Sequence, residues 1–113
     1  MEMEKKLFLT DFDGTLLRDD KTISREDVRT LETLRQKEIV TVIATGRSVY
    51  SFEKALEDIG MFRGNRCLPV DYVIFSTGAG IMEFPGGKVI FQRALPSSDI
   101  RKITRYFDHR MFD

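Results

Sequence analysis

The sequence of 113 residues has few of the residue types on which many enzyme sites and extracellular scaffolds depend. Cys67 is its single cysteine, His109 is its single histidine, and tryptophan is absent. A lone cysteine excludes an internal disulfide, and a lone histidine disfavours both a serine–histidine triad and a zinc site of histidine and cysteine ligands. We expect Cys67 to be a small, partly buried side chain rather than a nucleophile.

An excess of charge is also lacking, because 18 lysine and arginine residues balance 18 aspartate and glutamate residues. A general nucleic-acid binder would need a basic surplus gathered on one face, so this class of protein is disfavoured. No apolar run is long enough to span a membrane, and the apolar stretch near the N-terminus is too short for a signal peptide. We therefore expect a cytoplasmic globular protein without nucleic-acid or membrane partners.

Strand and helix patterns alternate along the chain, which predicts an α/β fold: a Rossmann-like parallel sheet with flanking helices. The first strand is apolar on both faces, so we expect both of its faces to be covered. Two later patterns flank Pro-Gly-Gly and predict a β-hairpin. The expected strands are 5–11, 39–45, 71–77, 81–84 and 88–95, and the expected helices are 23–39, 48–60 and 97–112.

Two aspartates, one residue apart, follow the first strand in the string LFLTDFDGT. Residues two apart point to the same side of a strand, so Asp11 and Asp13 should converge at its carboxyl end, where open α/β sheets bind ligands. A hard divalent cation with oxygen ligands, for which Mg²⁺ fits best, would relieve their repulsion. Gly14 allows a sharp turn, and Thr15 offers a hydroxyl and an amide. The alternative is a solvated Asp-Gly turn at the surface.

The second predicted strand ends in a similar way, with the string IATGR. Thr45 is a hydroxyl donor at the strand tip, Gly46 frees the following amides, and Arg47 is expected to begin a helix whose N-terminus attracts anions. Parallel strands would bring Thr45 close to Asp11. The alternative is a plain strand-to-helix turn with Arg47 as a solvated charge. The third strand ends in STGAG, for which a glycine-rich start of a hairpin is the stronger interpretation.

DFDGTLL resembles the first motif of the haloacid dehalogenase (HAD) superfamily, a hydrophobic strand followed by D-x-D-G-T. IATGR is similar to the second motif, in which a threonine or serine closes the second strand. ATGR, the LEDIG that ends the next helix, and STGAGI followed by GGKVIFQRAL resemble the Cof-type branch, which includes sucrose-phosphatase-like enzymes. The resemblance runs from Leu7 to about Leu95.

The resemblance implies a Mg²⁺-dependent phosphatase that hydrolyses a small phosphomonoester, such as a sugar phosphate. Asp11 would be the nucleophile that forms an aspartyl phosphate, and Asp13 the general acid and then the base that activates water. The Asp11 carboxylate and the Asp13 backbone carbonyl would hold Mg²⁺. The residues implied in phosphate binding are Gly14, Thr15, Thr45, Gly46 and Arg47.

Two parts of the family pattern have no counterpart in this sequence: a lysine in the third motif and an acidic cluster in the fourth. The chain therefore resembles an incomplete HAD core, with residues 1–95 as a partial core domain and 96–113 as a helix leading into a missing cap. Branch members also usually carry Asn-Gly-Ala where this chain has Thr77, Gly78 and Ala79. We expect self-association or a missing C-terminal half to complete the sheet.

A catalytically incomplete module that binds a metal, a phosphate or a partner chain is the alternative function. A response-regulator receiver domain also uses an acidic pocket, but its pattern would require paired acids at the first strand. Here Asp11 and Asp13 straddle Phe12 within a D-x-D-G-T string, which favours the HAD-like interpretation. The substrate is not specified by the sequence, because the cap that would select it is missing from the pattern.

Overall fold

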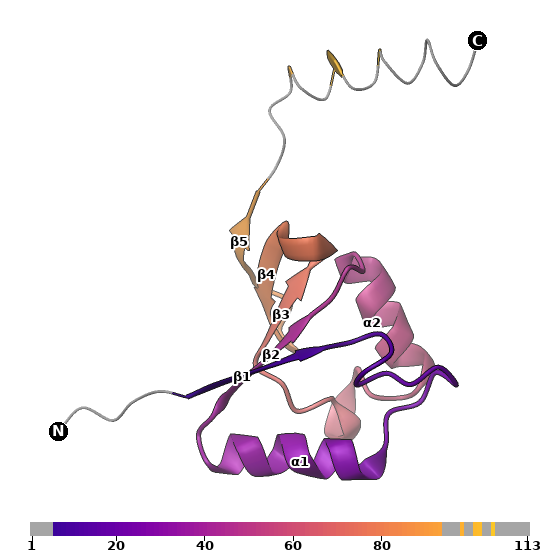
Figure 1. The fold of residues 1–113 in the computed structure, drawn as a ribbon, viewed down its shortest axis with the longest axis vertical. Coiled ribbons are helices and arrows are strands. Elements are labelled where there is room, and N and C mark those ends of the chain that lie inside the picture. The colour runs from indigo at the N-terminus through magenta and orange to yellow at the C-terminus, as the bar shows by residue number, and fades with distance from the viewer. Residues whose placement is uncertain (1–5, 94–97, 99–100, 103–104, 106–113) are drawn as a thin grey trace, which may run out of the picture.

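The computed structural model describes residues 6–93 and, beyond them, residues 98, 101, 102 and 105 (Figure 1). Strands β1 to β3 run parallel, and β4 and β5 form an antiparallel hairpin that extends the same sheet in the order β1-β2-β3-β4-β5. This arrangement confirms the predicted α/β fold with a terminal hairpin. The elements are β1 Leu7–Asp11, α1 Arg25–Gln36, β2 Val40–Ala44, α2 Val49–Asp58, β3 Tyr72–Phe75, β4 Gly80–Glu83 and β5 Val89–Gln92.

Helix α1 begins at Arg25, two residues after the start that the sequence predicts. The Ser24 hydroxyl accepts a hydrogen bond from the Asp27 amide at 3.0 Å, which satisfies one of the free amides of the first turn. The helix ends at Gln36, three residues before its predicted end. The predicted helix over 97–112 and the division at residue 95 lie mostly outside the described residues, of which 98, 101, 102 and 105 are helical. No helix in the described part of the chain has the length and apolar character to cross a bilayer.

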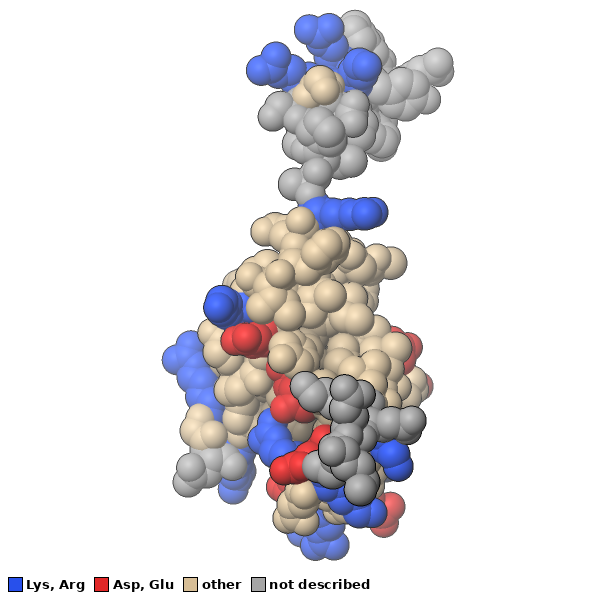
Figure 2. Space-filling view, turned by 90° about the vertical axis from the view of Figure 1, so that its left-hand side faces the viewer, with Lys and Arg blue, Asp and Glu red and all other residues tan. Residues whose placement is uncertain are grey.

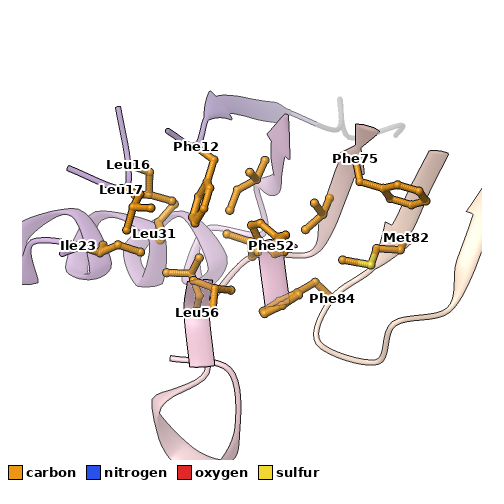
Figure 3. Close-up of a cluster of buried hydrophobic side chains, with 14 residues drawn as sticks. Phe12, Leu16, Leu17, Ile23, Leu31, Phe52, Leu56, Phe75, Met82 and Phe84 are labelled. Carbon is orange, nitrogen blue, oxygen red and sulfur yellow. The ribbon is translucent and has the colours of Figure 1, made fainter. Parts of the chain in front are cut away.

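The hydrophobic core lies between one face of the sheet and the two helices (Figure 3). Phe52 of α2 is fully buried and makes edge-to-face contacts with Phe12 and Phe84, at centroid distances of 4.8 and 5.9 Å. Leu31 of α1 and Ile43 of β2 belong to the same cluster. Both helices therefore cover the same face of the sheet, and they fix the strand tips relative to one another.

Strand β1 differs from its prediction. Its apolar residues Leu7, Phe8 and Leu9 are 64%, 39% and 55% exposed, so the expectation that both faces are covered is wrong for the described chain. The physical reason is position: β1 pairs only with β2 and forms the edge of the sheet. The prediction assumed a central strand, which is where such continuous apolar runs normally occur.

Candidate active site

The carboxyl ends of three parallel strands meet at one edge of the sheet. Asp11 at the end of β1 is in register with Ala44 at the end of β2. Thr45 follows directly, and its amide donates to the carbonyl of Ile74 in β3 at 2.9 Å. The structure thus brings the tips carrying Asp11 and Thr45 side by side, as the sequence predicts for parallel neighbours.

A tight turn follows β1 and holds Asp13 at the same edge. The Gly14 amide donates to the Leu17 carbonyl and the Leu17 amide to the Phe12 carbonyl, both at 2.8 Å. Gly14 has φ 77°, a left-handed conformation that glycine adopts without strain. Phe12 and Leu17 are buried, so both ends of the turn are anchored in the core while Asp13 is exposed.

The guanidinium of Arg47 binds the carboxylate of Asp13. Its Nε lies 3.0 Å from both carboxylate oxygens, and its Nη2 lies 2.8 Å from Oδ1. Its Nη1 donates to the hydroxyl of Ser51 at 3.0 Å, and its Cζ lies 5.8 Å from the centre of the Phe12 ring. Arg47 therefore joins the β1 turn to α2, and Ser51 is a contributor that the sequence motifs did not indicate.

This ion pair changes the proton affinity of Asp13. Hydrogen bonding from Arg47 is the largest cause of a lowered Asp13 pKa, and partial burial opposes it. The same hydrogen bonds raise the pKa of Arg47. Asp13 is thus a carboxylate at neutral pH while the pair is formed, a state suited to accept a proton rather than to give one. Arg47 also supplies a counter-charge to Asp13 from within the chain.

The sequence suggested that Arg47 begins the second helix, but α2 does not start there. Ser48 is the N-cap, its hydroxyl accepts from the Ser51 amide, and the helix starts at Val49. The Arg47 amide instead donates to the hydroxyl of Thr45 at 3.1 Å, and Thr45 is only 5% exposed. The prediction failed because two hydroxyls bind backbone amides in this turn: Thr45 binds the Arg47 amide, and Ser48 binds the Ser51 amide and caps the helix. A strand-to-helix pattern in the sequence does not reveal such side-chain contacts.

The third strand tip braces the second. After β3, the Ser76 amide donates to the Arg47 carbonyl at 2.8 Å and the Thr77 amide donates to the Thr45 carbonyl at 3.2 Å. Ser76 and Thr77 have φ 50° and 55°, so two consecutive residues other than glycine are left-handed. Such strain persists only where the surroundings hold the backbone in place. The string STGAG is thus both the start of the hairpin and a support for the loop that carries Arg47.

The remaining predicted phosphate ligands are spread around this edge. The Thr15 amide donates to the Phe12 carbonyl at 3.4 Å, and Thr15 lines a hollow between β1 and α1 together with Phe8. Gly46 is exposed beside the Thr77 hydroxyl. The structure therefore gathers Asp11, Asp13, Thr45, Gly46 and Arg47 around two neighbouring tips and places Thr15 toward α1.

Mg²⁺ prefers oxygen ligands, and Asp11 and Asp13 supply such oxygens at this edge of the sheet. No three acidic, histidine or cysteine side chains within the described residues come together to hold a metal ion. Mg²⁺ is nevertheless usually bound by one or two carboxylates plus water and substrate phosphate. Asp11 is exposed at the strand tip and forms no ion pair with the described residues, so its carboxylate and the Asp13 carbonyl fit that mode of binding.

A hollow of about 330 Å³ opens next to Arg47. Leu17 and Lys21 border it on the side of the β1 turn, and Tyr50 and Lys54 border it on the side of α2. Cys67, in contrast, is half-buried away from the strand tips, and its thiol lies 3.2 Å from the Phe62 carbonyl. Burial raises the pKa of its thiol, and its position confirms the expectation of a small, partly buried side chain.

A mixed sheet with flanking helices, and with acids and hydroxyls at the adjoining tips of its parallel strands, defines an α/β protein with a candidate polar site at that edge. The chain belongs to the haloacid dehalogenase-like hydrolase family, whose model matches residues 8–112. Among curated proteins it is similar to YkrA of Bacillus subtilis, with 26% identity over 106 residues. That match covers 94% of this chain and 37% of YkrA.

A second curated relative is more similar over a shorter stretch. The Bacillus subtilis 5-amino-6-(5-phospho-D-ribitylamino)uracil phosphatase YitU is 45% identical over 47 residues, which cover 42% of this chain and 17% of YitU. Among solved structures, BT1666 from Bacteroides thetaiotaomicron, a phosphatase of the haloalkanoate (HAD) superfamily, has 31% identity and a TM-score of 0.73. It aligns with 93% of this chain, which spans only 35% of BT1666.

Proposed function

We propose that this chain carries the nucleophile-bearing part of a Mg²⁺-dependent phosphatase that hydrolyses a small phosphomonoester, such as a sugar phosphate. The observation that carries the proposal is the meeting of Asp11, Asp13 and Thr45 at adjoining tips of β1 and β2. The family and the phosphatase named among its relatives support the reaction class. We propose a cytoplasmic location from the sequence.

In this mechanism, a carboxylate oxygen of Asp11 attacks phosphorus, and the bond to the leaving oxygen breaks to give an aspartyl phosphate. Water then attacks that phosphorus and releases inorganic phosphate and the Asp11 carboxylate. Mg²⁺, when bound by the Asp11 carboxylate and the Asp13 carbonyl, would offset negative charge on the nucleophile and the phosphate. The hydroxyl of Thr45 and the amide of Gly46 would donate hydrogen bonds to the phosphoryl oxygens.

Asp13 would transfer a proton in both steps. Its pairing with Arg47 suits the second step, in which it takes a proton from water. To protonate the leaving oxygen in the first step, Asp13 must first bind a proton, which the contacts with Arg47 oppose. We therefore assign Arg47 a part in setting the state of Asp13 as well as in phosphate binding, and the hollow beside it is the space that we assign to the leaving group.

A binding module without turnover is the second candidate. It is favoured by Asp11, whose carboxylate forms no ion pair with the described residues; a phosphate-transfer site usually presents a cation there. Such a module would retain affinity for Mg²⁺ and a phosphate analogue but would not hydrolyse esters.

The test is hydrolysis of an aryl phosphate by the purified chain with Mg²⁺, beside Asp11→Asn and Asp19→Asn. Asp19 is an exposed aspartate in the same loop region and is the matched control. Turnover that is lost in D11N and kept in D19N supports the phosphatase. Equal turnover in both variants refutes it.

If no variant turns over, binding of Mg²⁺ with beryllium trifluoride, a mimic of an acyl phosphate, decides between the two functions. Binding that D11N alone abolishes supports the module without turnover. No binding by the unchanged chain rejects both functions for this chain.

A further inference from the structure

The hollow beside Arg47 lies between the loop that follows β1 and one stripe of α2, both on the right of Figure 1. Residues four apart on a helix lie on the same face, and Ser51, Ala55 and Ile59 line the hollow in this order. From Ser51 to Ile59 this stripe extends about 12 Å at the rise of an α-helix. The hollow can therefore hold a molecule that begins at the candidate site and continues along the helix.

The floor of the hollow is apolar. Leu17 is 2% exposed and belongs to the core, and Ala55 and Ile59 are partly buried against that core. The Ser51 hydroxyl already accepts a hydrogen bond from Nη1 of Arg47 at 3.0 Å. A ligand with many hydroxyls would find few partners here, and each hydroxyl that loses water without a partner lowers the affinity. The lining therefore fits a body with few hydroxyls, such as a ring or a short hydrocarbon.

Three cations of the described chain border the hollow, and two of them are paired. Arg47 lies 2.8 Å from Asp13, and Lys54 lies 3.6 Å from Asp58. The third, Lys21, forms no ion pair with any residue that the structure describes. Hydrogen bonds from Arg47 lower the pKa of Asp13 most, and the charge of Lys21 adds to this effect. The hollow therefore keeps one positive charge for a ligand, close to the candidate site.

The loop holds Lys21 at this border in an unusual backbone conformation. Its φ is 64°, in the left-handed region that residues other than glycine adopt rarely. The neighbouring Asp20 is engaged within the loop, because its carboxylate accepts from the amide and the hydroxyl of Thr22 at 3.1 and 2.6 Å. Strained residues of this kind cluster at sites that hold ligands. Lys21 is therefore a candidate ligand contact, and the adjacent acid does not cancel its charge by direct contact.

Figure 2 shows the opposite side of the molecule, with a wide area that carries no charge and, lower down, basic and acidic side chains next to one another. The hollow instead combines an apolar floor with the charge of Lys21. We propose that the leaving group of the substrate is an apolar body with a carboxylate, and that this hollow binds it with Lys21 as the counter-charge.

This inference rests on the proposed phosphatase function and narrows its small phosphomonoester to the phosphate ester of a hydroxy acid. One carboxylate matches the single positive charge of Lys21. A second phosphate would instead bring a charge of about −1.5 to −2 at neutral pH.

The test measures binding to the purified 113-residue chain with Mg²⁺ and needs no turnover. The two probes are benzylphosphonate and para-carboxybenzylphosphonate, which differ by one carboxylate and contain no ester bond to hydrolyse. Calorimetry gives both dissociation constants, and NMR shifts of the amides show which residues respond. At low salt we expect the carboxylate probe to bind about threefold to fivefold more tightly, because an exposed charge pair contributes modestly. The added shifts should appear at Lys21 and Ala55.

Lys21→Asn removes the proposed counter-charge, and Lys88→Asn is the matched control. Lys88 is an exposed lysine in the hairpin and does not line the hollow. Asparagine tolerates the left-handed backbone at position 21, so the loop should keep its shape. In K21N the ratio of the two dissociation constants should fall to about one, whereas K88N should keep the ratio of the unchanged chain. Circular dichroism checks that both variants fold.

Three results with these probes would overturn the proposal. Equal affinity for the two phosphonates would mean that the chain does not recognise the carboxylate. A preference that survives in K21N would assign the recognition to another group. Tighter binding of para-xylylene bisphosphonate than of the carboxylate probe would assign the hollow to a second phosphate.

If neither phosphonate binds, the phosphate site of the proposed function fails, and benzoate tests the hollow alone. Benzoate shifts of the Lys21 and Ala55 amides that K21N abolishes and K88N retains would support the carboxylate site. No shift at these amides would overturn it. The failure of the phosphatase function and the failure of this inference are therefore distinguishable.

Discussion

The ion pair between Asp13 and Arg47 can be measured by a double-mutant cycle with Asp13→Asn and Arg47→Met. Both changes remove charge and keep the approximate shape, and methionine keeps an apolar stem near Phe12. Unit charges about 4 Å apart attract by about 1 kcal/mol in water and about 4 kcal/mol at an effective dielectric constant of about 20. The two side chains are 46% and 26% exposed, so solvent screening favours the lower value.

We expect a coupling free energy of about 1 kcal/mol, near the top of the range for exposed pairs because the contact is bidentate. The assay is urea unfolding of the four proteins at neutral pH, followed by circular dichroism, and the coupling should shrink in about 1 M salt. Loss of the cation–π contact with Phe12 affects both arms of the cycle equally and therefore cancels.

The pH dependence of the coupling has a definite sign. The pKa of Asp13 is lower in the folded chain than its ordinary value of 3.8, so the pair stabilises the fold fully above that value. The stabilisation is lost as the pH falls through the folded-state pKa, because protonated Asp13 no longer attracts Arg47. A coupling of zero at low salt and neutral pH, or one that persists unchanged below both pKa values, would refute this account.

Three further predictions concern the scaffold, and each is checked by chemical unfolding of the purified variant. Phe52→Ala should cost about 3–5 kcal/mol, because it empties the centre of the aromatic cluster, whereas the exposed control Tyr50→Ala should stay within about 0.5 kcal/mol. Gly80→Ala should cost about 1–3 kcal/mol, since the added methyl would collide with the ring of Phe75; no loss would mean that the ring moves freely. Thr77→Asn should stabilise by about 0.5 kcal/mol, because asparagine tolerates the left-handed backbone better than a β-branched residue; a loss would indicate a structural role for the threonine hydroxyl.

Local signals in the sequence were sufficient for most of the scaffold. Helix α1, capped by the hydroxyl of Ser24, lies within the predicted range 23–39, and the two segments around Pro-Gly-Gly pair as a hairpin. These features depend on residues close together in the chain, where capping and turn preferences act directly. The same holds for the meeting of Asp11 and Thr45, because parallel neighbouring strands end at one edge.

The features that the sequence did not predict depend on contacts between distant residues. Arg47 and Asp13 are separated by 34 positions, and their pairing requires the β1 turn and the start of α2 to face each other. Ser51 joins them because it lies one turn into that helix. The exposure of Leu9 was missed for a related reason. An apolar pattern indicates that a strand can be buried on both faces, but it does not show which strands and helices lie beside it.

The turn that carries Asp13 is anchored in the core, and the loop that follows it is held by hydrogen bonds of its own. Its ends are fixed in the core through Phe12 and Leu17, while the next loop closes on itself: the Arg18 amide donates to the Thr22 carbonyl, and the Lys21 amide donates to the Arg18 carbonyl. Residues inserted between Arg18 and Thr22 would therefore lengthen this exposed loop without moving the carboxylate of Asp13. Insertions in this loop would therefore change which molecules approach the candidate site, while Asp11 and Asp13 keep their positions.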